Sequence, residues 1–303
     1  MFLSLCPKRI RPMRRCAAWL LCLAVSQVWA VEAEPKKLIS STVGDTSIQV
    51  SELEPESESD YAEEIVTLTR EGSQPITLRD VHFYVLYTDP DPTHAPNMIV
   101  QGFSGGANCC DTLHIISFSP TLHMQDIQAL NSDQIDMQAV AHGGPTLGFY
   151  DFSFAFWHHS FAGSPAPPIS LSWDTAQGRY VLDVDSMRKP APSNVELEED
   201  AQELLTEEVD SKQPWPPTLL WHDMLTYIYS GNSASARTLM DTAWQPTWGD
   251  KERFFTCFSR ELHKGWLWGH MDIGHLMTAD ADFPKPISLP EPVQRAEYLN
   301  CLR

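Results

Sequence analysis

Short runs of alternating apolar and polar residues recur between residues 47 and 184. In the clearest run, Val81, Phe83 and Val85 fall on one face of an expected β-strand, and His82 and Tyr84 fall on the other. This pattern predicts strands over residues 47–50, 81–87, 97–103, 112–118, 151–157, 169–173 and 180–184. Because no helical period intervenes, these strands predict an antiparallel sheet arrangement, either a sandwich or propeller-like blades.

From residue 218 onward the apolar positions recur with a helical period. Leu220, Met224 and Ile228 form one stripe, which ends at Gly231-Asn232. Further helices are expected over residues 197–205, 233–243, 254–262 and 266–277. The first of these has a strongly acidic outer face, and the helices on either side of residues 231–232 predict a helical hairpin.

Proline clusters at residues 190–192 and 214–217 interrupt both patterns and mark a connector. We therefore predict an α+β protein with an N-terminal antiparallel β domain and a small C-terminal α-helical domain. The predicted parts are a signal peptide (1–30), a β-rich domain (31–189), a linker with a short helix (190–217) and an α-helical domain (218–303). Both domains are long enough to bury a core of their own.

The first 30 residues have the features of an export signal. Five basic residues precede an apolar run over residues 16–25, and Val28 and Ala30 satisfy the small-residue cleavage rule. The run is shorter than the roughly 20 residues that cross a bilayer, so we expect cleavage near Ala30 and a periplasmic product. Secretion is the alternative, and Leu21 before Cys22 disfavours a lipid anchor. No later segment is long and apolar enough to predict a membrane span.

The chain is strongly acidic, with 21 Lys+Arg against 40 Asp+Glu and a formal net charge of −19. Loss of residues 1–30 removes five basic and no acidic residues, which changes the charge to −24. Such a surface repels nucleic acid and anionic lipid, so neither is an expected partner. The acidic residues are not spaced as metal ligands, which favours a well-solvated surface over cation binding or a basic partner.

Cysteines carry the most chemistry in the chain. Four of the seven lie after the leader: the adjacent pair Cys109-Cys110, together with Cys257 and Cys301. Sequence alone allows three pairings. We favour Cys257–Cys301, which staples the tail to a helix, closes a loop of about 45 residues and is worth about 4 kcal/mol. That pairing leaves Cys109 and Cys110 to each other, and the alternatives are buried thiols, a Cu(I) site or a redox pair.

Other chemical motifs are weaker. Asp89-Pro90-Asp91 resembles the start of a calcium loop, but the glycine of such a loop is missing, so a proline-rigid turn is favoured. Neither a Gly-x-Ser-x-Gly motif nor a phosphate-binding or dinucleotide-binding fingerprint occurs in the sequence. We therefore predict no cofactor, and calcium and copper remain the two metals that any motif suggests.

Two stretches of the β region resemble a known family. Residues 105–113 (GGANCCDTL) are similar to the Gly-Gly-Ala-x-Cys-Cys-x-Thr-Leu signature of a group of uncharacterised exported bacterial proteins, and residues 151–168 are similar to a second stretch of that group. Some relatives resemble FG-GAP or VCBS repeats, with an Asp-x-Asp-Gly loop that residues 141–145 lack. The resemblance covers residues 75–190 and implies a propeller-like fold without implying an activity.

These observations predict a non-enzymatic binding or interaction module of the cell envelope, whose partner is an envelope protein or a small ligand. The alternative is a metal-binding or thiol-redox factor, or a hydrolase, that uses the Cys109-Cys110 region. The candidate binding residues are those of the signature and its following strand: Gly105, Gly106, Asn108, Cys109, Cys110 and His114.

Overall fold

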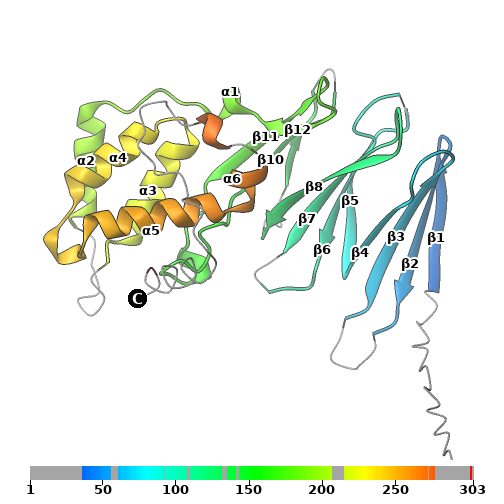
Figure 1. Cartoon of the computed structure of the whole chain (residues 1–303), viewed down its shortest axis with the longest axis horizontal. Coiled ribbons are helices and arrows are strands. Elements are labelled where there is room, and N and C mark those ends of the chain that lie inside the picture. Colours follow the sequence, from blue (N-terminus) through cyan, green and yellow to red (C-terminus); the bar gives the residue numbers. More distant parts are fainter. Residues whose placement is uncertain are drawn as a thin grey trace, which may run out of the picture. The chain divides into compact units, whose positions relative to one another are not determined.

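The computed structural model describes residues 36–55, 61–91, 93–107, 110–131, 135–140, 143–206, 215–271, 273–276 and 301. The predicted signal peptide, residues 1–30, lies outside this part. The described residues belong to one compact unit, Glu34–Arg303. In them the predicted α+β class is confirmed: three four-stranded antiparallel sheets are accompanied by six α-helices (Figure 1).

Each sheet is a meander in which strands that are consecutive in sequence pair side by side, the form of a propeller blade. The first sheet contains β1 (Lys36–Val43), β2 (Thr46–Leu53), β3 (Glu63–Arg70) and β4 (Ile76–Asp80). The second contains β5 (His82–Thr88), β6 (Met98–Phe103), β7 (Asp111–Ser117) and β8 (His123–Leu130). The third contains β9 (Asp136–Gln138), β10 (Thr146–Tyr150), β11 (Pro168–Asp174) and β12 (Arg179–Leu182).

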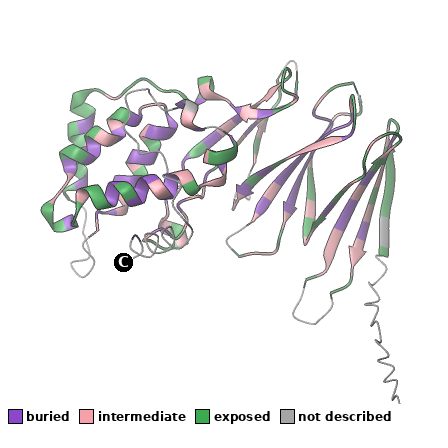
Figure 2. Ribbon diagram, in the orientation of Figure 1, coloured by how far each residue is buried: buried purple, intermediate pink, exposed green. Residues whose placement is uncertain are grey.

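The second sheet is buried on both faces, which its sequence explains. On β6, Val100 belongs to an apolar cluster shared with Val66 and Leu68 of the first sheet, whereas its neighbour Ile99 belongs to a larger cluster that includes Leu171 of the third sheet. Successive side chains of a strand point to opposite faces, so the continuous apolar run of β6 supplies both clusters. Figure 2 shows the resulting bands of buried residues along the strands.

The first sheet has a second face, opposite the one that contains Val66 and Leu68, and this second face is largely polar. Cross-strand register aligns Gln49 with Thr67 and Thr67 with Thr77, and it aligns Ser47 with Thr69. These side chains alternate with the buried Val66 and Leu68 and are exposed or half-buried. This face is rich in hydroxyl and amide groups, and Ile65 is the buried apolar residue that shares it with Thr67 and Thr69 on β3.

The helices follow the third sheet in sequence and share its core. They are α1 (Val184–Met187), α2 (Asn194–Leu204), α3 (Thr218–Tyr229), α4 (Ser233–Ala243), α5 (Lys251–Lys264) and α6 (Trp266–His270), with short 3-10 turns at Phe161–Gly163, Pro246–Trp248 and Ile273–Leu276. The larger apolar cluster joins strand residues such as Leu147 and Ile169 to helix residues such as Leu220 and Phe258. One apolar core therefore contains residues from both the predicted β domain and the predicted helical domain. The division into two domains stays a prediction.

The strand predicted over residues 151–157 is wrong: these residues form consecutive turns. The carboxylate of Asp151 accepts the backbone N–H of Ser153 at 2.8 Å, which turns the chain immediately after β10. Phe152 and Phe156, expected on one strand face, both pack on Phe161, with ring centroids 5.4 and 5.5 Å apart. Aromatic residues two positions apart therefore mimicked the period of a strand.

The predicted disulfide between Cys257 and Cys301 is confirmed, with an S–S distance of 2.02 Å. Cys257 lies on α5, and both cysteines are buried. The bond attaches residue 301 to the helical layer. His158 adds a second attachment, because its ring bonds to the backbone of Cys301 and stacks on Trp215 at a centroid distance of 4.1 Å.

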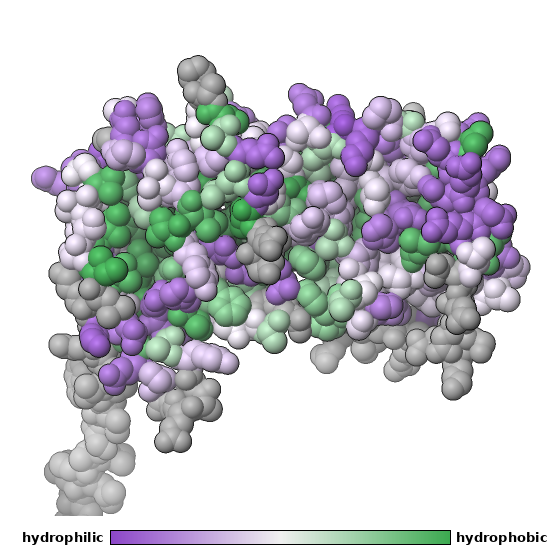
Figure 3. All heavy atoms as spheres, turned by 180° about the vertical axis from the view of Figure 1, so that it is seen from behind, coloured by the Kyte–Doolittle hydropathy of each residue, from purple (hydrophilic) through white to green (hydrophobic). Residues whose placement is uncertain are grey.

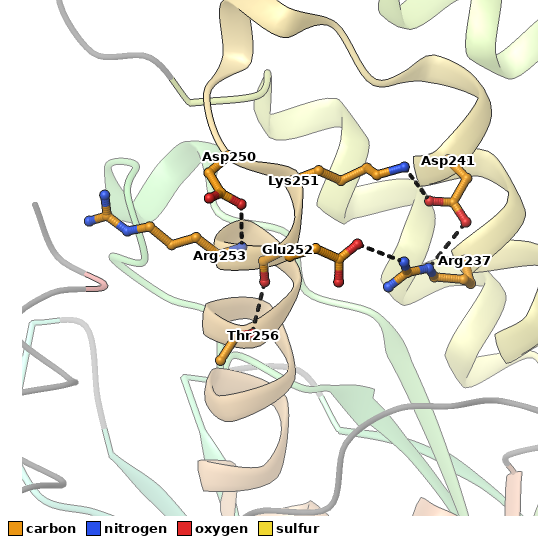
Figure 4. Close-up of polar contacts among 7 residues, drawn as sticks. All are labelled: Arg237, Asp241, Asp250, Lys251, Glu252, Arg253 and Thr256. Carbon is orange, nitrogen blue, oxygen red and sulfur yellow. Dashed lines mark hydrogen bonds and ion pairs between the residues drawn. The ribbon is translucent and has the colours of Figure 1, made fainter.

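An ion-pair network ties α4 to α5 (Figure 4). The Arg237 guanidinium lies 3.2 Å from Asp241 Oδ2 and 3.1 Å from Glu252 Oε1, and it sits 4.2 Å above the ring of Phe255. Lys251 Nζ lies 2.8 Å from Asp241 Oδ1 at the edge of the same network. A planar guanidinium serves all three partners at once, which an ammonium group cannot do.

We therefore expect Arg237→Lys to lower the free energy of unfolding by about 1 kcal/mol, because it loses the stacking on Phe255 and one of the two ion pairs. Lys251→Ala is the matched control, with an expected loss below about 0.5 kcal/mol, since it breaks one partly exposed ion pair. Urea unfolding of both variants measures the difference. Equal losses in the two variants would contradict the central role of Arg237.

Candidate functional site

Of the signature residues, 105–107 and Cys110 lie between β6 and β7, and residues 111–113 begin β7. The Ser104 N–H donates to the carbonyl oxygen of Cys110 at 3.3 Å, and the Cys110 N–H donates to Ser104 Oγ at 3.2 Å, which closes the base of the turn. Gly105 has a φ of +86°, and an added Cβ would lie 3.2 Å from the side chain of Val81 and 3.4 Å from that of Tyr61. The glycine is therefore required by backbone conformation and by a close approach to the first sheet.

Cys110 is disulfide-bonded, and the other described cysteines, Cys257 and Cys301, are bonded to each other. Asn108 and Cys109 lie outside the described residues. So do residues 141–142 of the segment 141–145, which lacks the Asp-x-Asp-Gly loop of some relatives. The pairing of Cys109 with Cys110 stays a prediction. A disulfide at Cys110 is the form expected of a structural staple rather than of a thiolate metal ligand.

His114 does not join the signature turn. It lies four residues beyond Cys110 on β7, a distance of about 13 Å at the rise of a strand. His114 Nδ1 is 2.7 Å from Asp126 Oδ1 of β8. A methyl group added to Gly102 would lie 3.1 Å from His114 Nε2 and 2.4 Å from Asp80 Oδ2, so these two side chains meet above that glycine.

His114 and Asp126 thus form a polar contact within the second sheet, and Asp80, at the end of β4 in the first sheet, lies near them above Gly102. Burial raises the pKa of Asp80, and the hydrogen bond from the Val81 N–H and the nearby His114 oppose this rise. The sequence contains no local signal for this cluster. Asp126 reaches His114 through cross-strand register, and Asp80 reaches it through the packing of two sheets.

A cavity among the described residues has a volume of about 710 Å³. It lies at the loop ends of the second and third sheets, and we call it the loop cavity. The side chains that matter for its chemistry are Tyr87, Asp89, His94, His123, Val140 and Trp173. Pro96 and Pro120 also line it, and both follow cis peptide bonds. Apolar rings, a carboxylate and imidazoles therefore share one concave surface.

The loop after β5 holds its residues in place through a chain of hydrogen bonds. Asp89 Oδ1 accepts the Asp91 N–H at 2.9 Å, and Asp91 Oδ1 accepts the Thr93 N–H at 2.9 Å. The fully buried Asn97 donates from Nδ2 to the Asp91 carbonyl at 2.8 Å and accepts the Phe118 N–H at 2.7 Å. Asn97 therefore fixes this loop to the end of β7.

His94 bridges the two aspartates of this loop. Its Nδ1 lies 3.0 Å from Asp89 Oδ2, and its Nε2 lies 3.5 Å from Asp91 Oδ2. The hydrogen bond with Asp89 and the charge of Asp91 raise the pKa of His94, and hydrogen bonds from Thr93 lower the pKa of Asp91. The carboxylates that resemble a calcium loop in sequence thus contact an imidazole. Among the described residues, no group of three or more His, Cys, Asp or Glu side chains is arranged to hold a metal ion.

The loop cavity was not predicted from the sequence. Residues 89–93 were expected to form a proline-rigid turn. Residues 89–91 have no regular structure, Thr93 lies in a turn, and Pro92 lies outside the described residues; the pattern did not connect this segment to Trp173, which lies some 80 positions later. The only local signal is a proline-dense run, Asp89 to Pro96, placed between two predicted strands. Such a run predicts a rigid loop, and the cavity arises from four loops that come together, those between β5 and β6, β7 and β8, β9 and β10, and β11 and β12.

No helix in the described ranges combines the length and the apolar character that a membrane crossing requires.

No protein-family model matches this chain, and neither a curated protein nor a solved structure matches it significantly.

Proposed function

We propose that this chain is a non-enzymatic, exported binding protein and that the loop cavity is its ligand site. The observation that carries the proposal is a cavity of about 710 Å³ lined by Tyr87 and Trp173 together with Asp89, His94 and His123. Ligand pockets typically have volumes of about 300–1,000 Å³ and combine apolar walls with a few polar groups. A small polar molecule fits both the volume and this lining.

Preorganisation supports the same proposal. The wall that contains Asp89 is held by Asn97, and Trp173 packs edge-on against Tyr180 at a centroid distance of 5.4 Å. The Tyr180 hydroxyl in turn donates to the Pro145 carbonyl at 2.8 Å. Side chains that are already ordered lose little entropy on binding, which favours affinity.

Export to the periplasm remains part of the proposal. The leader-like residues 1–30 support it, and so does the Cys257–Cys301 disulfide, because such bonds persist in oxidising compartments. The alternative, a metal-binding or thiol-redox factor at Cys109-Cys110, requires reduced cysteines and a nearby third ligand. The disulfide at Cys110 and the bond between His114 and Asp126 favour the binding protein over this alternative.

Filling the loop cavity tests the proposal. Val140, which is 45% exposed, lines the cavity, and Val195, which is 62% exposed, lies on α2 outside the cavity lining. In an NMR screen of wild-type protein against glucose, choline, spermidine, acetate and phosphate, we expect at least one compound to bind. Val140→Trp should weaken that binding about tenfold or more by steric overlap, whereas Val195→Trp should leave it unchanged.

The contradicting outcome is equally definite. If bound compounds shift the resonances of other regions and Val140→Trp binds them as well as wild type does, the loop cavity is not the ligand site. If no compound binds the wild type, the proposal fails for these ligand classes.

A further inference from the structure

Resting on the proposed function, we propose that the ligand of the loop cavity is an organic cation, which takes the place of His94 beside Asp89 and Asp91. The side chain of His94 already occupies a position between two carboxylates at the rim of the cavity. An imidazolium in that position is an internal counterpart of a ligand cation.

The charges around the cavity favour this ligand class. Asp89 lines the cavity, and the described lining residues include neither Lys nor Arg, the side chains that recognise phosphate or carboxylate groups. The whole chain carries a formal charge of −19, so its field attracts cations and repels anions. An anionic ligand would meet repulsion at long range and find no described Lys or Arg partner in the cavity lining.

The aromatic walls add a second contribution. Tyr87 and Trp173 both line the cavity, and the faces of such rings attract a cation within about 6 Å of their centroids. The edge-on contact with Tyr180 holds the Trp173 ring in place. A carboxylate together with aromatic rings is the combination that recognises ammonium groups.

His94 is placed to leave, whereas Asp89 is placed to stay. The His94 side chain is 64% exposed, and that of Asp89 is 22% exposed and also accepts the Asp91 N–H. Rotation of the exposed imidazole toward solvent uncovers Asp89 Oδ2 and Asp91 Oδ2 without disturbing the loop. The loop therefore carries an internal competitor that a ligand cation must displace.

This competition depends on pH with a definite sign. Hydrogen bonding to Asp89 raises the pKa of His94, so the imidazolium persists at mildly acidic pH and is lost as pH rises through that pKa. A permanently charged ligand should therefore bind more tightly as pH rises. Asp89, His123 and Tyr87 are the other titratable groups that line the cavity; Asp89 and Tyr87 belong to the proposed binding site, so a variant of His123 serves as the control for the pH dependence.

Choline and its neutral isostere 3,3-dimethyl-1-butanol form the decisive pair of probes, because they share a shape and choline is charged at every pH. Isothermal titration of the full chain should show choline binding, with the alcohol weaker by about tenfold or more. From about pH 5 to about pH 8, the dissociation constant of choline should fall about two- to fivefold, the effect of an exposed ion pair. His94→Gln should bind choline at low pH as wild type does at high pH, and His123→Gln should keep the pH dependence.

Asp89→Asn should weaken choline binding about tenfold or more without changing the binding of the alcohol. Circular dichroism of each variant confirms that it is folded. Failure of choline to bind, equal affinity for the two probes, or tighter binding of choline at low pH would each overturn the cation proposal. Binding of a neutral compound that Val140→Trp abolishes would overturn it while leaving the proposed ligand site intact.

Discussion

Replacement of both Cys257 and Cys301 by alanine is expected to lower the free energy of unfolding by about 4 kcal/mol, the largest effect that the structure predicts. The two cysteines are separated by 44 positions in the sequence. In the chain-entropy account, closing a loop of that length lowers the entropy of the unfolded chain and so stabilises the folded state by about 4 kcal/mol. Urea unfolding followed by tryptophan fluorescence measures the loss, since the urea midpoint reports stability at constant m-value.

A reductant supplies the matched control for this double variant. Reducing the wild type should cause at least this loss, because reductant also breaks the disulfide of Cys110, and the loss that reductant causes in the double variant reports that second disulfide separately. A loss below about 1 kcal/mol would show that the segment ending at residue 301 is held by contacts such as that of His158, and would contradict the entropic account.

The second large effect concerns Asp151, a carboxylate that is 2% exposed at the end of β10. Tyr229 of α3 and the Ser153 hydroxyl donate to its two oxygens, and the Ser153 N–H donates at 2.8 Å. This network joins the turn segment after β10 to the helical layer. Asp151→Ala leaves two hydroxyl groups and one N–H without their acceptor, so we expect the free energy of unfolding to fall by about 3 kcal/mol.

The same residue predicts a pH dependence of stability. Burial raises the pKa of Asp151 in the folded protein, and the hydrogen bonds from Ser153 and Tyr229 offset part of the rise. The folded state therefore keeps this proton to higher pH than the unfolded state does. Stability from this residue is greatest below the unfolded pKa and falls as pH rises from that value through the folded pKa.

Asp151→Asn separates charge from shape, because the amide keeps an oxygen for Tyr229 or Ser153 and does not titrate. We expect it to lose less stability than Asp151→Ala at neutral pH and to remove the fall in stability with rising pH. Chemical unfolding at several pH values between about 4 and about 8 makes the comparison. An unchanged pH profile in Asp151→Asn would assign that fall to other carboxyl groups.

Periodicity in the sequence predicted six of the twelve strands that the structure describes and five of its six α-helices. The alternation over residues 81–87 corresponds to β5 (His82–Thr88), and the helical stripe of Leu220, Met224 and Ile228 corresponds to α3 (Thr218–Tyr229). It succeeded because apolar burial on one face of a strand or helix imposes its period directly on neighbouring residues. The prediction from periodicity failed at residues 151–157, where the Ser153 N–H donates a hydrogen bond to the Asp151 carboxylate and so competes with strand pairing.

Polar outer surfaces were harder to recognise. β1, β3 and β4 belong to the first sheet, and no strand was predicted for them. Their apolar positions are fewer, and one face of this sheet carries hydroxyl groups. A strand that buries little apolar area on either face shows only a weak alternation of apolar and polar residues. Figure 3 shows the hydropathy of the surface seen from behind the view of Figure 1, where apolar areas lie among strongly hydrophilic ones.

The residues themselves predicted the α+β class and favoured the Cys257–Cys301 pairing among three, because the first depends on local period and the second on few alternatives. The loop cavity and the Asp80–His114–Asp126 contact required the folded chain. In the cavity, Asp89 follows a strand of the second sheet and Trp173 lies on a strand of the third, and their proximity is created by sheet packing rather than by spacing along the chain. Sequence order constrains neighbours within an element, whereas burial of apolar faces decides which elements meet, and the candidate ligand site lies where they meet.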